Sequence, residues 1–220
     1  MEHFFRRYRP WQRGEFVLAF QDTGAGGADN CAAQFLSQRW LDLPTVMQAH
    51  ITATATTPLI HAELEDVYEQ TGVRPVIAFE RNNGGGFEMD RLARLNRLGN
   101  YRIYTMKALN PMGKLVDTGK LGFDTNTATR PKMLSDLDDG LNSRLLHIYD
   151  RPTINEMFSF IVNPKTGKAE AEQGAHDDLV MSLAGVWQLY QTERPESDED
   201  SGGVVETVSL GYSGGIVYAE

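Results

Sequence analysis

Three acidic residues of this chain stand where an apolar segment ends or begins. Asp22 and Glu80 each follow a short apolar run, at 15–20 and 76–79, and glycines follow each of them. Asp178 opens a third apolar segment, within the run His-Asp-Asp-Leu-Val-Met. Because the ends of adjacent strands and the start of a helix packed on them can converge, we expect these three carboxylates to lie a few ångströms apart.

Carboxylates held this close repel one another, so the arrangement costs stability unless cations neutralise it. Hard oxygen ligands of this kind favour Mg²⁺ or Mn²⁺. Two such ions about 3.5–4 Å apart can activate a water molecule and steady the leaving oxygen in phosphodiester hydrolysis. The partial positive charge of a helix N-terminus would also keep Asp178 ionised as a ligand. The pattern therefore predicts a site for two divalent cations.

Each acidic residue also has a purely structural interpretation. Asp22, which precedes Thr-Gly, could form an Asx-type turn, whereas Glu80 at the end of a buried strand needs a partner of some kind. One of the adjacent Asp177 and Asp178 is expected to cap the helix. We assign the cations to Asp178, and the cap or an assisting role to Asp177. Asp29, beyond the glycine turn, is either a further metal ligand or a solvated turn residue.

Other residue types add little chemistry. His176 lies beside two Asp residues and either orients a phosphate or water, or is an exposed loop residue. The glycine-rich runs at 24–27 and 84–86 do not match a phosphate-binding loop of the form GxxxxGK[ST]. Three further histidines show no metal-ligand spacing and are interpreted as structural: His50, His61 and His147.

The hydrophobic periodicity predicts a mixed central sheet with helices on its faces, an α/β fold. The first two strands are expected to form a β-hairpin, and the run 76–80 is typical of a buried parallel strand. The expected strands are 15–20, 31–38, 45–54, 76–80 and 101–107, with a short edge element at 148–150. The expected helices are 57–71, 87–98, 131–145, 153–160 and 177–191, with a turn at 163–168.

The composition is that of a globular protein with a sizeable core, with 41% hydrophobic residues among 220. No apolar run approaches the roughly 18 residues of a membrane span, and the N-terminal stretch does not have the pattern of a secretory signal. The single cysteine, Cys31, suits a reducing cytosol and is interpreted as a core residue. We therefore expect no membrane association and no secretion.

The net charge of −9 argues against tight autonomous binding to nucleic acid through phosphate contacts. Much of this charge lies after residue 192, where seven acidic residues accompany the single Arg194. Clustered carboxylates at a cation site contribute as well, and bound cations would reverse the field there. We expect one domain over 1–192, followed by an acidic linker and C-terminal tail over 193–220.

In the order of the elements and in their local sequence motifs, these segments resemble the nuclease domain of the large terminase subunit of tailed bacteriophages, a ribonuclease-H-like fold. The resemblance spans about residues 14–191. Four segments carry it: Asp-Thr-Gly-Ala-Gly-Gly-Ala-Asp at 22–29, Phe-Glu-Arg-Asn-Asn-Gly-Gly-Gly at 79–86, Thr-Gly-Lys-Leu-Gly-Phe-Asp-Thr-Asn at 118–126, and His-Asp-Asp-Leu-Val-Met at 176–181.

The resemblance implies that Asp22, Glu80 and Asp178 correspond to the family's metal-binding acidic triad. The segment 118–126 would lie near DNA, with no catalytic role assigned to it. The implied activity is a metal-dependent endonuclease that uses Mg²⁺ or Mn²⁺ to cut concatemeric viral DNA during packaging, with little sequence preference.

The family's large subunit also carries an N-terminal ATPase motor, and nothing in this sequence resembles the phosphate loop of that motor. We therefore expect an excised nuclease domain whose full-length protein carries the motor. The expected partners are double-stranded DNA, that motor, the portal and the small terminase subunit. The expected location is the host cytoplasm, with transient attachment to the procapsid portal. The acidic tail has no counterpart and could contact the portal or other packaging proteins.

Three other interpretations are open at this stage. Another ribonuclease-H-like enzyme, such as a Holliday-junction resolvase or a transposase core, would share the metal triad and differ in substrate. An actin-like phosphotransferase shares the strand–Asp–glycine opening but gives the final His-Asp-Asp no role. A catalytically idle module that docks on a phage portal would bind no metal.

Overall fold

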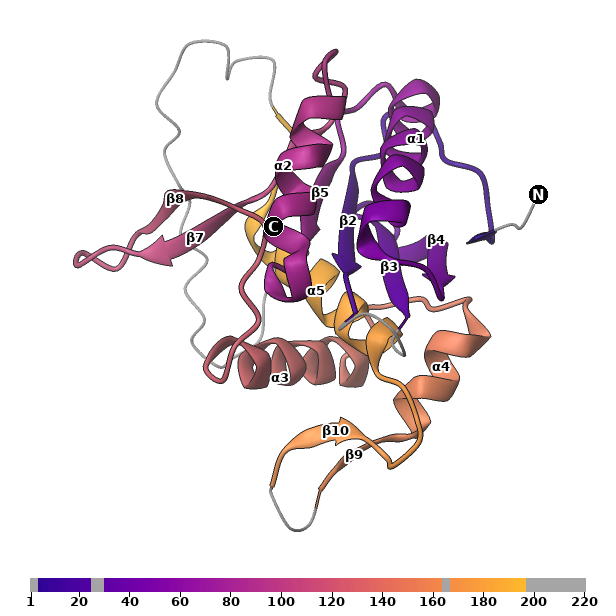
Figure 1. Ribbon diagram of the computed structural model, residues 1–220, viewed down its shortest axis with the longest axis vertical. Coiled ribbons are helices and arrows are strands. Elements are labelled where there is room, and N and C mark those ends of the chain that lie inside the picture. Colours follow the sequence, from indigo (N-terminus) through magenta and orange to yellow (C-terminus); the bar gives the residue numbers. More distant parts are fainter. Residues whose placement is uncertain (1–3, 25–29, 164–166, 197–220) are drawn as a thin grey trace, which may run out of the picture.

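The structure is a computed structural model that describes residues 4–24, 30–163 and 167–196. A six-stranded mixed sheet forms its centre (Figure 1), in the strand order β1-β4-β3-β2-β5-β6. The strands are β1 (Phe5–Arg7), β2 (Val17–Asp22), β3 (Cys31–Ser37), β4 (Asp42–Ala49), β5 (Val76–Phe79) and β6 (Arg102–Ile103).

Strand direction changes at β2. The pairs β1–β4, β4–β3 and β3–β2 are antiparallel, whereas β2–β5 and β5–β6 are parallel. The expected mixed sheet and the expected hairpin of the first two strands are therefore confirmed. The parallel half arises because a helix intervenes between the strands that form it, as parallel pairing requires.

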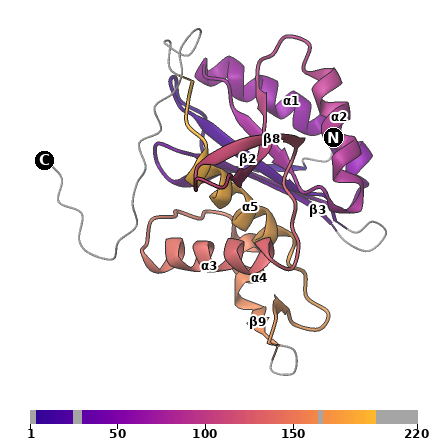
Figure 2. The ribbon, with the colours of Figure 1, turned by 90° about the vertical axis from the view of Figure 1, so that its left-hand side faces the viewer.

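Helices cover both faces of this sheet, as Figure 2 shows from the side. On one face lie α1 (Ala53–Thr71) and α2 (Gly85–Leu95), which follows the short 3₁₀ turn η1 (Asn82–Gly84). On the other lie α3 (Thr129–Asn142) and α5 (Asp178–Thr192), with α4 (Arg151–Phe158) packed against α5. Alternate residues of β2, β3 and β5 enter one or the other of the two hydrophobic cores.

Two antiparallel hairpins extend from this body. One hairpin is formed by β7 (Thr105–Leu109) and β8 (Leu115–Leu121), and it projects outward in Figure 1. The other is formed by β9 (Phe160–Val162) and β10 (Ala169–Ala171). The expected turn at 163–168 lies between β9 and β10, and its residues 164–166 are outside the described residues.

The expected boundary between the third strand and the first helix is wrong. The strand ends at Ala49 and the helix begins at Ala53, several residues before the expected start at Thr57. The reason is a cap that the sequence interpretation overlooked: the hydroxyl of Thr52 accepts a hydrogen bond from the Ala55 N–H at 3.3 Å. Pro58 consequently lies inside the helix and does not begin it.

The expected strand 101–107 is split between two sheets. At Tyr104 the N–H still donates to the Ile77 carbonyl of β5, while the Tyr104 carbonyl accepts from Gly122, just beyond β8. The chain therefore leaves the central sheet at this residue and enters the β7–β8 hairpin. The expected edge element at 148–150 is displaced, because the bridge to β4 is made by His147 with Asp42, while Asp150 caps α4 by accepting from the Thr153 N–H.

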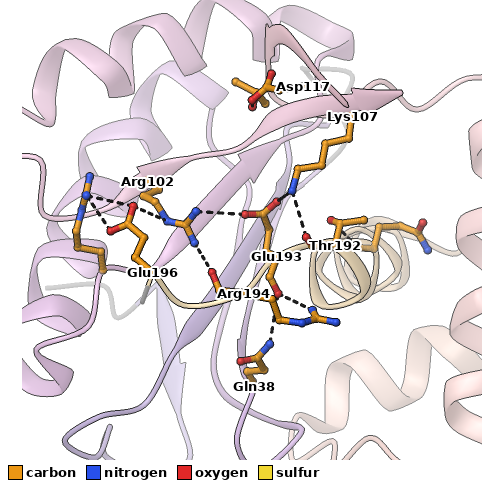
Figure 3. A network of polar contacts seen from close by, with 11 residues as sticks. Gln38, Arg102, Lys107, Asp117, Thr192, Glu193, Arg194 and Glu196 are labelled. Atoms are coloured by element: carbon orange, nitrogen blue, oxygen red, sulfur yellow. Dashed lines mark hydrogen bonds and ion pairs between the residues drawn. The ribbon is translucent and has the colours of Figure 1, made fainter. Parts of the chain in front are cut away.

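The chain after α5 remains attached to the domain (Figure 3). Glu193 is buried, forms an ion pair with Lys107 of β7, and lies 3.5 Å from a guanidinium nitrogen of Arg102 on β6. Arg102 also donates to the Arg194 carbonyl at 2.7 Å, and Arg74 pairs with Glu196 at 3.0 Å. The first residues expected in the acidic linker thus hold the edge of the sheet.

Within the described residues, no helix combines the length and apolar character needed to cross a membrane.

Helix α5 approaches β2 unusually closely at Gly185. A Cβ atom at this position would lie 2.3 Å from the ring of Phe20, well inside van der Waals contact. Because α5 carries Asp178 and β2 carries Asp22, this close approach sets the distance between two of the predicted site residues.

We predict that Gly185→Ala destabilises the protein by about 1–3 kcal/mol, since the added methyl overpacks the interface between α5 and β2. Urea unfolding followed by circular dichroism measures this loss. Gly86→Ala is the matched control, because its Cβ would meet only Arg81 at an ordinary 3.5 Å. Equal stabilities for Gly185→Ala and the unmodified protein would contradict this account.

The N-terminal arm, which comprises β1 and Tyr8, is held by a buried acid. The fully buried Asp150 accepts hydrogen bonds from Arg6 at 2.5 and 3.0 Å and from the Tyr8 hydroxyl at 2.6 Å. Burial raises the pKa of Asp150, but the hydrogen bonds from Arg6, Tyr8 and Thr153 outweigh it and leave that pKa below its ordinary value.

A carboxyl whose pKa is lower in the folded state stabilises the protein above its unfolded pKa of about 3.9, and this contribution is lost as pH falls through the folded value. We therefore predict that acidification below about pH 4 destabilises the unmodified protein more steeply than Asp150→Asn. Thermal melts across this range measure the difference. Asp138→Asn, at an exposed position of α3, should keep the unmodified slope.

Candidate metal centre

The alternation of side chains along β2 and β5 brings Asp22 and Glu80 together. In both strands the even-numbered residues enter the core beneath α5, and continuing this alternation places both acids on the same face. Gln21 of β2 pairs with Phe79 of β5, and the Glu80 N–H donates to the Gln21 carbonyl at 2.8 Å. The next residues of the two strands are therefore neighbours at the edge where both strands end.

Asp178, the first residue of α5, lies near enough for its charge to act on Asp22. Asp22, Glu80 and Asp178 are all buried, with 7%, 8% and 7% of their surfaces exposed. Burial raises the pKa of Asp22 well above its ordinary value, and the charge of Glu80, a hydrogen bond with Glu80 and the charge of Asp178 raise it further. The Gly24 N–H donates to Asp22 at 3.1 Å and lowers the pKa of Asp22, but this effect offsets only part of the rise.

Glu80 is oriented by the turn that follows it. The side-chain amide of Asn82 donates to Glu80 Oε1 at 3.0 Å and to the Thr125 carbonyl at 2.7 Å, and Thr23 Oγ1 donates to the Asn82 carbonyl at 3.0 Å. At Gly85 a Cβ atom would lie 1.7 Å from the Glu80 carbonyl oxygen, so only glycine fits there. Asn82 and Gly85 belong to the motif at 79–86. The sequence of this motif indicated a site, but it did not reveal the hydrogen bond of Asn82 to Glu80 or the close approach at Gly85.

Asp177 points to another partner. Its carboxylate forms an ion pair with Arg130 of α3 at 2.8 Å, and its side chain makes no capping hydrogen bond to α5. His176 is about half exposed, and its Nδ1 lies 3.7 Å from Asp178 Oδ2. Asp29, the other candidate ligand, lies outside the described residues.

A fourth carboxylate, Glu156 of α4, also reaches the start of α5 and was not identified from the sequence. Its Oε2 accepts the N–H of Leu179 at 2.8 Å. Burial raises the pKa of Glu156, and the nearby charge of Asp178 contributes to this rise. No local pattern marks this residue, because its partners lie in other elements.

Two residues interpreted as structural have structural partners. His61 Nδ1 lies 2.9 Å from the Tyr101 hydroxyl, on the face of the sheet covered by α1 and α2. Cys31 is buried, with its sulfur 3.2 Å from the Thr23 carbonyl. Burial, with the charge of Asp22 next in importance, raises the pKa of this thiol to about 11, so it remains protonated at neutral pH.

The residues present fit divalent cations. A buried carboxylate such as Asp22, whose pKa is raised by burial and by neighbouring acids, is an electrostatic cost that a bound cation removes, and carboxylate oxygens are the ligand type that Mg²⁺ and Mn²⁺ prefer. Asp22 and Glu80 form a close pair, while Asp178 acts on Asp22 through its charge. Over the described ranges, no group of three His, Cys, Asp or Glu side chains has the geometry of a complete metal-binding set.

Comparison with known proteins bears on the fold. No family model matches this sequence, and no curated protein matches it significantly. Solved structures do: the large terminase nuclease of thermophilic phage G20c with bound magnesium has a TM-score of 0.60 at 13% identity, over 86% of this chain and 88% of that one. The large terminase nuclease domain of Thermus phage P74-26 has a TM-score of 0.61 at 14% identity, over 88% and 89%.

A manganese-soaked terminase nuclease domain of human cytomegalovirus has a TM-score of 0.52 at 14% identity, over 80% of this chain and 83% of that one. At such identities the likeness shows the fold alone. The expected fold class is thus confirmed, and this chain has the ribonuclease-H-like mixed sheet of terminase nuclease domains.

Proposed function

We propose that this chain is a metal-dependent DNA endonuclease that cuts concatemeric viral DNA during genome packaging. One observation supports the proposal: the buried Asp22 and Glu80 form a close pair at the ends of β2 and β5, and the charge of the buried Asp178 of α5 acts on Asp22, in a sheet that has the fold of terminase nuclease domains. Solved terminase nuclease structures that are similar to this chain were obtained with magnesium, cobalt, zinc and manganese, which supports a divalent-ion site in this fold.

In this proposal Asp22, Glu80 and Asp178 hold two Mg²⁺ or Mn²⁺ ions. The bound ions supply Lewis acidity and an activated water for phosphodiester hydrolysis. The chain's own contribution is to hold these oxygens: Asn82 fixes one oxygen of Glu80, and the Gly24 N–H fixes one oxygen of Asp22. The α5 N-terminus adds partial positive charge beside Asp178.

Two arginines place positive charge beside these acids. Arg81 directly follows Glu80 and pairs with Asp124 at 3.1 Å, and Arg130 pairs with Asp177 next to Asp178. Both side chains are partly exposed, at 27% and 32%, so their guanidinium groups can exchange these carboxylates for DNA phosphates. This local positive charge supports a nucleic-acid substrate in an otherwise acidic chain.

The remaining assignments extend this proposal. The nuclease domain covers 1–192, and the segment 193–220 is an acidic linker and tail that contacts the portal or other packaging proteins. The partners are double-stranded DNA, an ATPase motor in the same full-length protein, the portal and the small terminase subunit. The protein acts in the host cytoplasm, at the procapsid portal.

We predict that the protein cuts supercoiled plasmid in the presence of Mn²⁺ or Mg²⁺, and that EDTA abolishes the cutting. Asp22→Asn, Glu80→Gln and Asp178→Asn should each lose more than the roughly 10–100-fold that accompanies loss of an outer partner of a metal ligand. Gel electrophoresis of time courses measures the rates.

The matched control is Asp138→Asn, which removes one exposed carboxylate from α3 and should keep full activity. Cutting that survives all three site substitutions would refute the assigned site. Cutting confined to four-way junction DNA would indicate a resolvase, and ATP hydrolysis without DNA cutting would indicate a phosphotransferase.

The same charges predict a stability effect without metal. Asp22→Asn should raise the melting temperature in EDTA at neutral pH, because it removes a carboxyl whose ionised form is disfavoured by burial and by the charges of Glu80 and Asp178. It should also reduce the stabilisation that millimolar Mn²⁺ gives the unmodified protein. Asp177→Asn is the contrasting variant, since it loses an ion pair with Arg130 and gains no such relief. Differential scanning calorimetry measures both changes, and a melting temperature lowered by Asp22→Asn in EDTA would contradict the repulsion.

A further inference from the structure

The N-terminus of α5 lacks the cap that its own sequence offers. The first amides of a helix have no acceptors within the helix, and a side chain at the residue before it commonly supplies one. Asp177 occupies that position, but its carboxylate instead pairs with Arg130 of α3. The start of α5, which bears Asp178, therefore needs an acceptor from elsewhere.

Glu156 of α4 supplies it across the tertiary structure. Its Oε2 accepts the Leu179 N–H at 2.8 Å, and its Oε1 accepts the side-chain amide of Gln48 of β4 at 3.0 Å. One carboxylate thus joins three elements: the helix that carries it, the central sheet and the first turn of α5. The tied amide belongs to the residue directly after Asp178.

The helix that presents Glu156 is itself anchored. Asp150 caps α4 through the Thr153 N–H and is held by Arg6 of the N-terminal arm. Thr153 Oγ1 accepts from the side-chain amide of Gln34 of β3 at 3.0 Å, and the same amide lies 3.3 Å from the Leu179 carbonyl. The position of Glu156 is therefore determined by the sheet.

We propose that Glu156 is a positioning residue that caps α5 from α4 and thereby sets where Asp178 stands relative to Asp22 and Glu80. The inference rests on the proposed function, in which these three acids hold divalent ions. Its two oxygens accept hydrogen bonds from the Leu179 N–H and the Gln48 amide, and we assign its effect on the site to the Leu179 amide. Its role depends on an acceptor oxygen and not on a negative charge.

The test compares Glu156→Gln with Glu156→Leu in the whole chain. Gln keeps an oxygen for the Leu179 N–H, whereas Leu keeps the approximate size and has no acceptor. Mn²⁺ titration by isothermal calorimetry should show affinity near that of the unmodified protein for Glu156→Gln. Glu156→Leu should bind roughly 10–100-fold more weakly, as expected for loss of an outer support of a metal ligand.

Hydrogen exchange supplies a readout that does not involve metal. In EDTA the Leu179 amide should exchange faster in Glu156→Leu than in Glu156→Gln, because only the former leaves it without an acceptor. Asn155→Leu, at the neighbouring exposed position of α4, is the matched control and should change neither measurement. Thermal melts establish that each variant is folded at the assay temperature.

Each outcome is informative. If Glu156→Gln loses as much Mn²⁺ affinity as Glu156→Leu, the charge itself is required and the positioning role is overturned. Unchanged affinity in Glu156→Leu overturns it as well, and so does an unmodified protein that binds no Mn²⁺. An unmodified protein that binds Mn²⁺ with the expected variant pattern but cuts no DNA refutes the nuclease function and leaves the positioning role supported.

Discussion

Repulsion among buried carboxylates is the constraint on which the rest of this structure depends. Asp22, Glu80 and Asp178 are nearly removed from water, and burial together with the charges of Glu80 and Asp178 disfavours the ionised form of Asp22. Such a cluster persists only where the surrounding elements are rigid enough to hold it. Two parts of the fold supply this rigidity. One is the pair of parallel strands β2 and β5, which end side by side, and the other is the first turn of α5, which packs across them.

Close backbone approaches and short tethers provide that rigidity. Gly185 lets α5 lie against the ring of Phe20, and Gly85 lets α2 begin against the carbonyl of Glu80. Larger residues at either place would push the acids apart. Farther away, Arg6 holds Asp150, which caps α4, and α4 carries the Glu156 that caps α5. The N-terminal arm is in this way connected by hydrogen bonds to the proposed metal site.

Positive charge is distributed according to the same constraint. Arg81 and Arg130 lie beside the acids at partly exposed positions, whereas Arg102 and Lys107 are engaged with Glu193 at the far end of α5 (Figure 3). Those two cations, with Arg74, line a pocket of about 520 Å³. Their partner Glu193 is buried, whereas Asp124 and Asp177, the partners of Arg81 and Arg130, are partly exposed. Phosphate-binding charge is therefore expected at the carboxylate edge, and the pocket near β6 serves to anchor the chain after α5.

The sequence alone determined the fold class and the places of Asp22, Glu80 and Asp178, because strand alternation and helix starts are local properties of the chain. It misplaced the start of α1 and the break at Tyr104, where a side-chain cap and a change of hydrogen-bonding partner decide. Only the tertiary structure decided that Asp177 pairs with Arg130 and that Glu156 caps α5. These contacts join residues 47 and 23 positions apart, and no local pattern encodes which distant donor a carboxylate will meet.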